Sequence, residues 1–457
     1  MEREKFGSRL GFILISAGCA LGLGNVWRFP YIVGQYGGAA FILIYLLFLV
    51  IFGLPIMTME FAVGRASRKS IAESFRVLEP KGTKWHQFGW VGMAGNYLLM
   101  MFYTTVTGWM FAYFFKMIKG DFIGQTTEQV SNQFVEMTGN PYILVGFMVL
   151  AVVLGFVICS LGLKKGVEKV TKFMMLALLA IIAVLAVRAV TLPGAVDGVK
   201  YYLVPDFGKM IENGIGEVVF AALGQAFFTL SIGMGSMAIF GSYIDKDKRL
   251  LGESVSIAAL DTFVAFMAGL IIIPSCFAYG VNPGAGPGLI FQTLPNIFNA
   301  MPMGRLWGAL FFVFMIFAAV STVVAVFENI LSFGMDLWGW SRKKACLINL
   351  IAVIVLSLPC ALGFNVLSGV QLLGKGSTIL DFEDFIISNN ILPLGSLVYV
   401  LFCTWRKGGW GWDNFIEEAN AGQGIAFPKW LKVYAKYILP IILFVLWIQG
   451  YITMFFK

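Results

Sequence analysis

Charged residues are scarce in this chain of 457 residues. Aspartate, glutamate, lysine and arginine make up 13% of it, whereas soluble globular proteins contain about 25% charged residues. Hydrophobic residues reach 59%, and the mean hydropathy is +0.82. This composition argues against a water-soluble enzyme and predicts a protein embedded in a lipid bilayer.

Metal ligands and reactive side chains are equally sparse. The single histidine, His86, lies in a basic segment, and the six cysteines form no CxxC pair. No nucleophile–base pair or phosphate-binding loop stands out, and the GLG string at 22–24 lacks the strand context of a dinucleotide motif. We therefore predict no enzymatic activity and no cofactor. The net charge of +8 does not indicate a nucleic-acid partner, because the basic residues cluster between apolar runs.

Eleven apolar runs are long enough to cross a membrane as helices, which requires about 20 residues for a hydrocarbon core of about 30 Å. The runs are continuous rather than alternating, which excludes a transmembrane β-barrel. We predict an all-α integral membrane protein in which 1–457 forms one transmembrane domain. The runs lie near residues 10–35, 39–63, 89–115, 142–161, 167–190, 214–241, 255–280, 305–334, 345–362, 383–404 and 434–455.

The basic residues predict the orientation of these helices. With the N-terminus in the cytoplasm, most of the 33 lysine and arginine residues fall on the cytoplasmic side, as the positive-inside rule requires. An odd number of helices then places the C-terminus outside. On the outer side, residues 282–302 form an apolar segment without clear periodicity, either a lid or a loop folded passively on the helix ends.

Two runs contain a pair of glycines near the middle: Gly22 and Gly24 in the first, Gly233 and Gly235 in the sixth. Each glycine weakens a helix by about 1 kcal/mol relative to alanine, although glycines in membrane helices also permit close packing. Interruptions at corresponding positions of two halves indicate an inverted-repeat transporter with its site at mid-membrane. The expected segments are two five-helix repeats, with helices 1 and 6 unwound, and one additional helix, at 9–190, 214–404 and 429–457.

The chemistry of an unwound segment limits which substrates and ions can bind there. Bare main-chain carbonyls in hydrocarbon cost several kcal/mol each, and a desolvated cation satisfies them. The half-helix that begins near Leu23 aims its amides and the positive end of its dipole at an anion. Carbonyls for a cation beside amides for a carboxylate predict an amino acid carried together with sodium.

Three strings carry a family resemblance. RLGFILISAGCALGLGNVWRFPY (9–31) with GGAAF (37–41), and GQAFFTLSIGMGSMAIFGSY (224–243), resemble the first and sixth helices of the neurotransmitter:sodium symporter family. The resemblance extends over all eleven runs and is closest to bacterial eleven-helix members. It implies a symporter of the bacterial cytoplasmic membrane that imports a neutral, hydrophobic or aromatic amino acid with two sodium ions by alternating access.

The resemblance also assigns residues to sites. It implies a first sodium site at Ala20, Asn25, Thr229 and Asp261, and a second at Gly18, Leu21, Ala318, Ser321 and Thr322. The implied substrate-binding residues are Leu23, Gly24, Leu99, Tyr103, Phe228, Thr229, Ser231, Met234, Thr322 and Val326. The implied gates are Arg28 with Asp384 outside and Arg9 with Asp336 inside, the latter braced by Tyr243.

One departure from the family concerns chloride. Asp261 stands where many members carry asparagine, while Tyr45 and Gln225 match positions that help hold chloride in chloride-dependent relatives. A fixed carboxylate can replace that anion by balancing sodium charge in a poorly solvated site. We therefore predict transport that does not require chloride.

Two alternatives stay open at this stage. One is a proton-coupled transporter in which Asp261 carries the proton, and the other is a membrane sensor that binds amino acids without cycling. The sequence identifies the small-molecule substrate, sodium and the lipid bilayer as partners. It leaves open which amino acid is preferred and whether the protein forms a homodimer.

Overall fold

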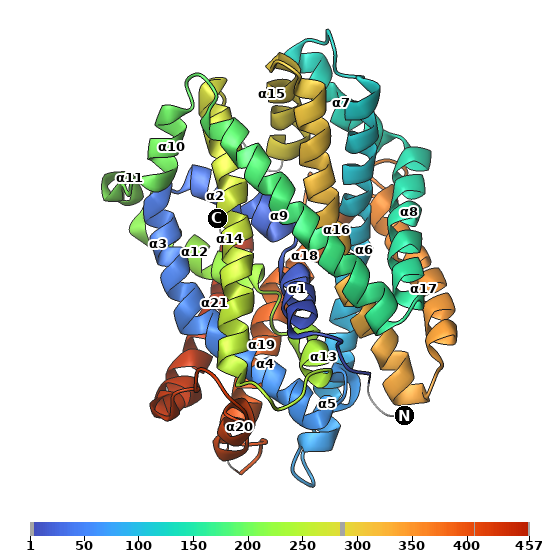
Figure 1. Ribbon diagram of the computed structural model, residues 1–457, viewed down its shortest axis with the longest axis vertical. Coiled ribbons are helices and arrows are strands. Elements are labelled where there is room, and N and C mark those ends of the chain that lie inside the picture. The colour runs from blue at the N-terminus through green and yellow to red at the C-terminus, as the bar shows by residue number, and fades with distance from the viewer. Residues whose placement is uncertain (1–3, 284–287, 406, 456–457) are drawn as a thin grey trace.

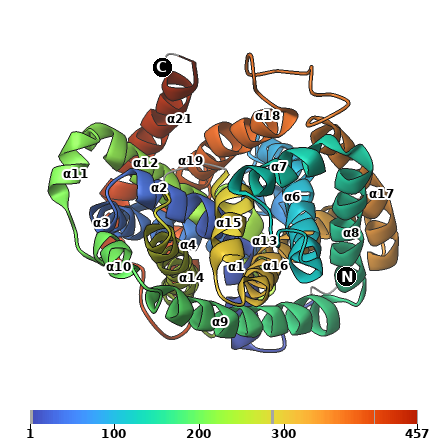
Figure 2. The same cartoon turned by 90° about the horizontal axis from the view of Figure 1, so that it is seen from above.

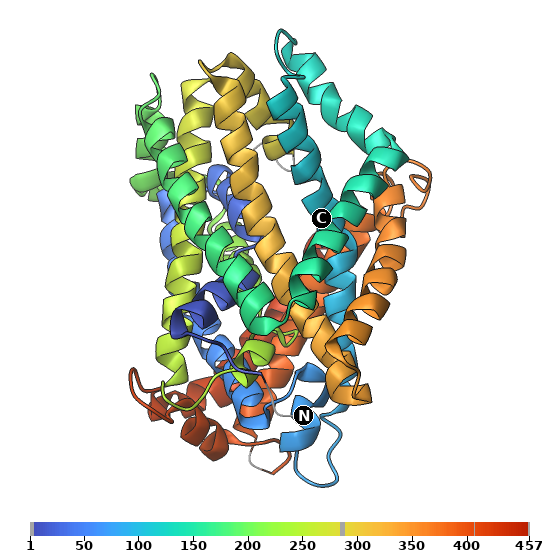
Figure 3. The same ribbon diagram turned by 45° about the vertical axis from the view of Figure 1, so that its right-hand side comes forward.

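The molecule is built from helices packed side by side. The computed structural model describes residues 4–283, 288–405 and 407–455. That part of the chain is mostly helical and has no strand beyond an isolated bridge between Lys248 and Gln423. Figures 1 and 3 show that most helices run along the long axis of the molecule. The predicted all-α fold is confirmed.

Within the described ranges, nine helical segments are long and apolar enough to cross a membrane. Five are single helices: α6 (Gln87–Lys119), α8 (Pro141–Ser160), α14 (Leu250–Ala278), α16 (Gly304–Trp338) and α17 (Arg342–Leu362). Four contain short turns of altered pitch: α3 (Ala39–Phe48) with η2 (Leu49–Gly53) and α4 (Leu54–Ser67); η3 (Leu163–Glu168) with α9 (Lys169–Val190); α18 (Ile379–Ile386) with η5 (Ile387–Ile391) and α19 (Leu392–Thr404); and η6 (Lys429–Leu431) with η7 (Tyr434–Ile438) and α21 (Leu439–Phe455).

Two further apolar segments are interrupted where the sequence carries its glycine pairs. The first consists of α1 (Arg9–Ala20), followed by η1 (Gly24–Arg28) and α2 (Phe29–Gln35), with a bend of 60° between them. The second consists of α12 (Ile215–Thr229) and α13 (Ser236–Ser242). The described chain has nine long spans, or ten with the first bent pair. Because α12 is a shorter apolar helix of 15 residues and is not among these spans, the eleven spans and the inverted repeats stay a prediction.

Shorter helices connect the spans. They are α5 (Ile71–Leu78), α7 (Thr127–Gly139), α10 (Val196–Leu203), α11 (Phe207–Glu212), α15 (Leu294–Ala300), which follows η4 (Leu289–Thr293), and α20 (Trp412–Ala419). The expectation of an irregular segment over 282–302 is wrong for most of its length, because 289–300 is helical; residues 284–287 lie outside the described part. Phe291 within it is buried among aromatic rings, which include Trp27 and Trp109. Burial of this side chain stabilises a helix that the local sequence pattern does not predict.

The spans differ in how deeply they are buried. In α16, 83% of the most apolar stretch is buried, whereas in the last span, which contains α21, the value is 17%. Figure 2 shows α16 among neighbouring helices and α21 projecting at the edge. A helix that is apolar on all sides suits either surrounding, since protein and lipid both exclude water. The two interrupted spans reach this interior, where α1 contacts α16 and α13 contacts α4.

Candidate ion and substrate site

The first interruption separates α1 from η1 at Leu21–Leu23. The hydrogen-bond ladder ends there: Gly22 N bonds to Ala20 O at 2.7 Å, and Leu23 N donates to the Tyr103 hydroxyl of α6 at 3.2 Å. A Cβ atom on Gly24 would lie 2.7 Å from the Phe228 ring. Glycine at position 24 therefore allows the two interrupted spans to approach each other closely.

The second interruption runs from Leu230 to Gly235. The backbone has φ of 50° at Ser231, 103° at Gly233 and 80° at Gly235, a region that glycine enters readily and serine rarely. The buried carboxylate of Glu60 on α4 accepts hydrogen bonds from Gly233 N at 2.8 Å and Met237 N at 2.9 Å. Glu60 thus holds the unwound segment and the first turn of α13, a role that the sequence does not assign to it.

Asp261 on α14 links the two interrupted spans. Its Oδ1 accepts a hydrogen bond from Asn25 Nδ2 at 2.8 Å, and its Oδ2 accepts one from Thr229 Oγ1 at 2.8 Å. All three side chains are buried, and Asn25 Oδ1 has no hydrogen-bond partner among the described residues. The carbonyl of Ala20 stands at the end of α1. The first predicted ion site is therefore a set of buried oxygen atoms at a helix break, which suits a desolvated cation.

The residues of the second predicted ion site lie together as well. Thr322 Oγ1 on α16 donates to Gly18 O at 2.9 Å and lies 3.1 Å from Leu21 O, while Ser321 Oγ lies 3.2 Å from Gly18 O. Both hydroxyls also contact Ala318 O, at 2.9 Å from Ser321 and 3.3 Å from Thr322. Five oxygen atoms, from the end of α1 with its cap residue Leu21 and from α16, thus lie together in a buried position. Carbonyl and hydroxyl oxygens at a helix break are the groups that could hold a sodium ion.

A cavity of about 270 Å³ lies between the two interruptions, α6, α16 and α18. Its lining is mainly apolar with few polar groups, as in most small-molecule sites. Eight of the predicted substrate-binding residues line it: Leu23, Gly24, Leu99, Tyr103, Phe228, Ser231, Met234 and Thr322. The cavity continues to Asp381 and Asp384 on α18.

Two of the predicted substrate-binding residues do not line this cavity. The hydroxyl of Thr229 bonds to Asp261, and Val326 is buried one turn after Thr322 on α16. Conversely, Phe102 and Val106 of α6 line the cavity without having been predicted. Their spacing from Leu99 and Tyr103 by three residues is a helical period that could have identified them.

The predicted outer gate residues lie at the cavity but form no ion pair within the described part of the chain. The Arg28 guanidinium lies over the Phe228 ring, 4.7 Å from its centre, which is a cation–π contact. Asp384 Oδ1 accepts a hydrogen bond from Ser388 at 2.8 Å. Both charged side chains line the same cavity, but they are not in contact as an ion pair.

The predicted inner pair requires a correction. Arg9 at the start of α1 pairs with Glu253 at the start of α14, at 2.9 Å, rather than with Asp336. Asp336 accepts a hydrogen bond from Ser70 N at 2.8 Å and lies 3.5 Å from Lys69 Nζ. Arg9 and Glu253 both line a cavity near the starts of α1 and α14. Because the two residues are far apart in the chain, the sequence alone does not indicate that they are neighbours.

Tyr243 belongs to another charged group on this side of the molecule. Its hydroxyl donates to Glu328 Oε1 at 2.8 Å, and Glu328, fully buried in α16, is paired with Arg342 at 2.7 Å. A buried carboxylate needs such partners, because an unpaired charge in a low-dielectric interior is very costly. These contacts join α13, α16 and α17. Tyr243 therefore contacts Glu328, whereas the sequence predicts that it supports a pair formed by Arg9 and Asp336.

Comparison with known proteins extends over the whole chain. The model of the sodium:neurotransmitter symporter family matches residues 3–138 and 121–456. The chain belongs to this family. An uncharacterized sodium-dependent transporter of Bacillus subtilis, YhdH, is 32% identical over 449 residues, covering 97% of each chain. The sodium- and chloride-dependent GABA transporter 2 of Bos taurus is 24% identical, covering 92% of this chain and 75% of that protein.

Among solved structures, this sodium:neurotransmitter symporter is similar to MhsT in complex with L-phenylalanine. The TM-score is 0.86, with 36% identity, covering 98% of this chain and all of that one. The family resemblance predicted from the two glycine-containing strings is therefore confirmed. The protein is a multi-pass, sodium-dependent membrane transporter.

Proposed function

We propose that this protein imports a neutral, apolar or aromatic amino acid together with sodium ions by alternating access. The observation that carries the proposal is the cavity between the two helix interruptions, which places apolar side chains beside the Leu23 amide, the Tyr103 hydroxyl and the Ser231 side chain. The Leu23 amide and the Tyr103 hydroxyl bind the substrate carboxylate, and Ser231 with the carbonyls of Phe228 and Thr229 binds the ammonium.

The variable end of the substrate faces apolar groups. Leu99, Val106 and Met234 line that part of the cavity, and a flexible methionine adapts to side chains of different shape. The structurally similar MhsT holds L-phenylalanine, which supports an aromatic or large aliphatic substrate here.

Two sodium ions drive the accumulation. One is held by Ala20, Asn25, Thr229 and Asp261, and the other by Gly18, Leu21, Ala318, Ser321 and Thr322. A membrane potential of 100 mV and a tenfold gradient supply about 7 kcal/mol for two ions. That energy accumulates a neutral substrate about 10⁵-fold at perfect coupling.

The transport cycle does not require chloride, because Asp261 supplies the negative charge beside the first sodium ion. Gln225 Nε2 already bonds to Gly24 O at 3.2 Å, and the buried Tyr45 lies on the neighbouring α3. The protein resides in the bacterial cytoplasmic membrane, with its N-terminus inside and its C-terminus outside. Residues 9–190 and 214–404 form the inverted repeats that alternate access, while 429–457 carry the additional helix.

Uptake by proteoliposomes tests the coupling ion. Radiolabelled L-phenylalanine accumulates when a sodium gradient is imposed and fails to accumulate when potassium replaces sodium. A pH gradient imposed without sodium gives no uptake. Equal uptake in potassium medium, or uptake driven by the pH gradient alone, would assign the driving force to protons or show that sodium is not coupled.

A further inference from the structure

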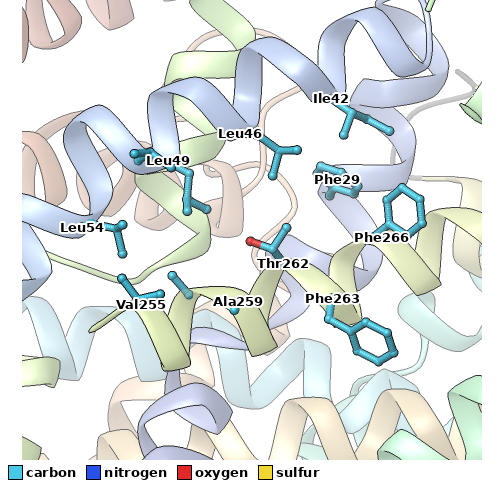
Figure 4. A pocket seen from close by; sticks show the side chains of 12 residues that line it. Phe29, Ile42, Leu46, Leu49, Leu54, Val255, Ala259, Thr262, Phe263 and Phe266 are labelled. Carbon is cyan, nitrogen blue, oxygen red and sulfur yellow. The ribbon is translucent and has the colours of Figure 1, made fainter. Parts of the chain in front are cut away.

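A second cavity, of about 390 Å³, lies on the far side of α14, between this helix and the span formed by α3, η2 and α4. Its volume is within the range of about 300–1,000 Å³ typical of small-molecule sites. Figure 4 shows apolar side chains around it, and Thr262 is the single residue with a polar side chain among its lining residues in the described chain. The Thr262 hydroxyl oxygen is itself buried, so the accessible wall of the cavity is almost entirely apolar.

The cavity opens sideways, toward the lipid. All but one of its lining residues belong to two membrane spans, Ala39–Ser67 and Leu250–Ala278. Val50 on one wall is 57% exposed and Phe263 on the other is 47% exposed, so the rim is open rather than sealed by protein. At this depth the surrounding medium is hydrocarbon.

The cavity is also elongated. Its lining residues extend from Ile42 to Leu54 on one span and from Val255 to Phe266 on the other, and the two rows face each other in Figure 4. At 1.5 Å per residue these stretches measure about 17 Å. One leaflet of the hydrocarbon core is about 15 Å thick, half of about 30 Å. The dimensions therefore match a single chain that lies along the helices.

We propose that this cavity binds one acyl chain of a bilayer phospholipid. The site is distinct from the substrate cavity, because α14 separates the two. Thr262 and Ala258 form its wall, and their neighbour Asp261 bonds to Asn25 and Thr229 on the opposite side. A bound acyl chain packs against the face of α14 that carries Ala258 and Thr262, and this packing helps to fix the position of Asp261 on the same helix.

A cavity-filling substitution tests the proposal. Ala259 lines the cavity and its side chain is exposed, so tryptophan there occupies the space without disturbing buried contacts. Ala180→Trp, at an exposed position of α9 outside this cavity, is the matched control. In native mass spectrometry of the detergent-purified protein, we expect the unmodified protein and Ala180→Trp to retain about one phospholipid, and Ala259→Trp to lose it. Equal retention by all three would overturn the proposal.

Photo-crosslinking identifies the occupant directly and does not depend on a bulky variant folding. A photoreactive benzoyl-phenylalanine at position 50 is irradiated in nanodiscs of dioleoyl phosphatidylcholine. A lipid adduct formed in higher yield at position 50 than with the same probe at the similarly exposed Val157 of α8 supports the proposal. Equal yields contradict it, and a dimer of this chain cross-linked at position 50 assigns the groove to a second copy and contradicts it too. Neither readout requires sodium binding or transport, so failure of the lipid site and failure of the proposed symport are distinguishable.

Discussion

The proposed second ion site depends on the positions of single oxygen atoms. Thr322 Oγ1 lies within 3.3 Å of three main-chain carbonyls, those of Gly18, Leu21 and Ala318. Hydroxyls on helices commonly bond only to their own preceding turn. Thr322 and Ser321 differ from such hydroxyls because they also contact main-chain carbonyls at the end of α1.

Removing these hydroxyls should weaken sodium binding. Ser321→Ala and Thr322→Val should each raise the sodium concentration for half-maximal phenylalanine binding about tenfold, a loss of about 1.4 kcal/mol. Scintillation proximity binding across a sodium titration measures this. Ser160→Ala, which removes an exposed hydroxyl at the end of α8, is the control and should leave the titration unchanged. Unchanged titrations for both variants would remove these residues from the ion site.

Substitutions of two buried glutamates are expected to have opposite effects on the stability of the protein. The carboxylate of Glu60 accepts hydrogen bonds from two main-chain amides, whereas the buried carboxyl of Glu383 has no partner in the described chain other than the weakly donating Cys360 thiol. Glu60→Met should destabilise the protein by about 2–4 kcal/mol, since two amides lose their acceptor. Glu383→Met should be neutral or stabilising, because a weakly paired polar group leaves the interior. Thermal midpoints in detergent measure both; a large loss on Glu383→Met would show that the carboxyl has a stronger partner.

At the scale of helices, the interruptions depend on backbone shapes that only some residues adopt. Gly233 has φ of 103°, and a Cβ atom there would lie 2.3 Å from the carbonyl oxygen of Leu392 on α19. The first constraint comes from the unwound backbone, and the second comes from the packing of this segment against α19. The same glycine in a continuous helix would be replaceable by alanine at a gain in stability.

Gly233→Ala should therefore reduce phenylalanine binding and lower the thermal midpoint. The left-handed backbone alone costs an alanine about 1–2 kcal/mol, before the contact with Leu392. Gly216→Ala in the first turn of α12, where a Cβ atom would meet nothing within 4 Å, should maintain or raise the midpoint. Equal effects at both positions would mean that residues 230–235 can adopt a helical conformation without loss.

The N-terminal segment is held by an ion-pair cluster outside the spans. A hydrogen bond from Lys5, together with the charges of Lys5 and Arg68, holds the pKa of Asp245 below its ordinary value of 3.8. This group stabilises the contact at pH values above 3.8, and the contribution is lost as the pH falls through the lowered pKa. Asp245→Asn should therefore increase hydrogen exchange of residues 5–12 at neutral pH. The difference from the unmodified protein should vanish in strong acid; a difference that persists there would contradict this role.

At the scale of the whole molecule, the sequence predicts what depends on periodicity and glycine placement. Continuous apolar runs identify the spans, and the paired glycines locate the two interruptions, because local backbone energetics determine both. The partner of Arg9, the helix at 289–300 and the role of Glu60 depend on contacts between segments far apart in the chain. The pairing of Arg9 with Glu253 spans 244 residues, a distance over which charge alone does not select a partner.

The proposed role of Asp261 is to supply the negative charge of the first ion site, which would make transport independent of chloride. Uptake by the unmodified protein should be unchanged when gluconate replaces chloride. Asp261→Asn should lose most uptake in gluconate and recover part of it in chloride, because an anion can then fill the role of the carboxylate. Glu253→Gln, at the far end of the same helix, should stay independent of chloride. A chloride requirement in the unmodified protein would refute the assignment.

The most direct test of the paired interruptions is a count of bound sodium. Equilibrium binding of radioactive sodium to the purified protein, with saturating phenylalanine, should give about two ions per molecule, and about one for the Ser321→Ala/Thr322→Val double variant. The same count in both proteins, or no bound sodium in either, would contradict the account of two ion sites, one between the two interruptions and Asp261 and the other between the end of α1 and α16.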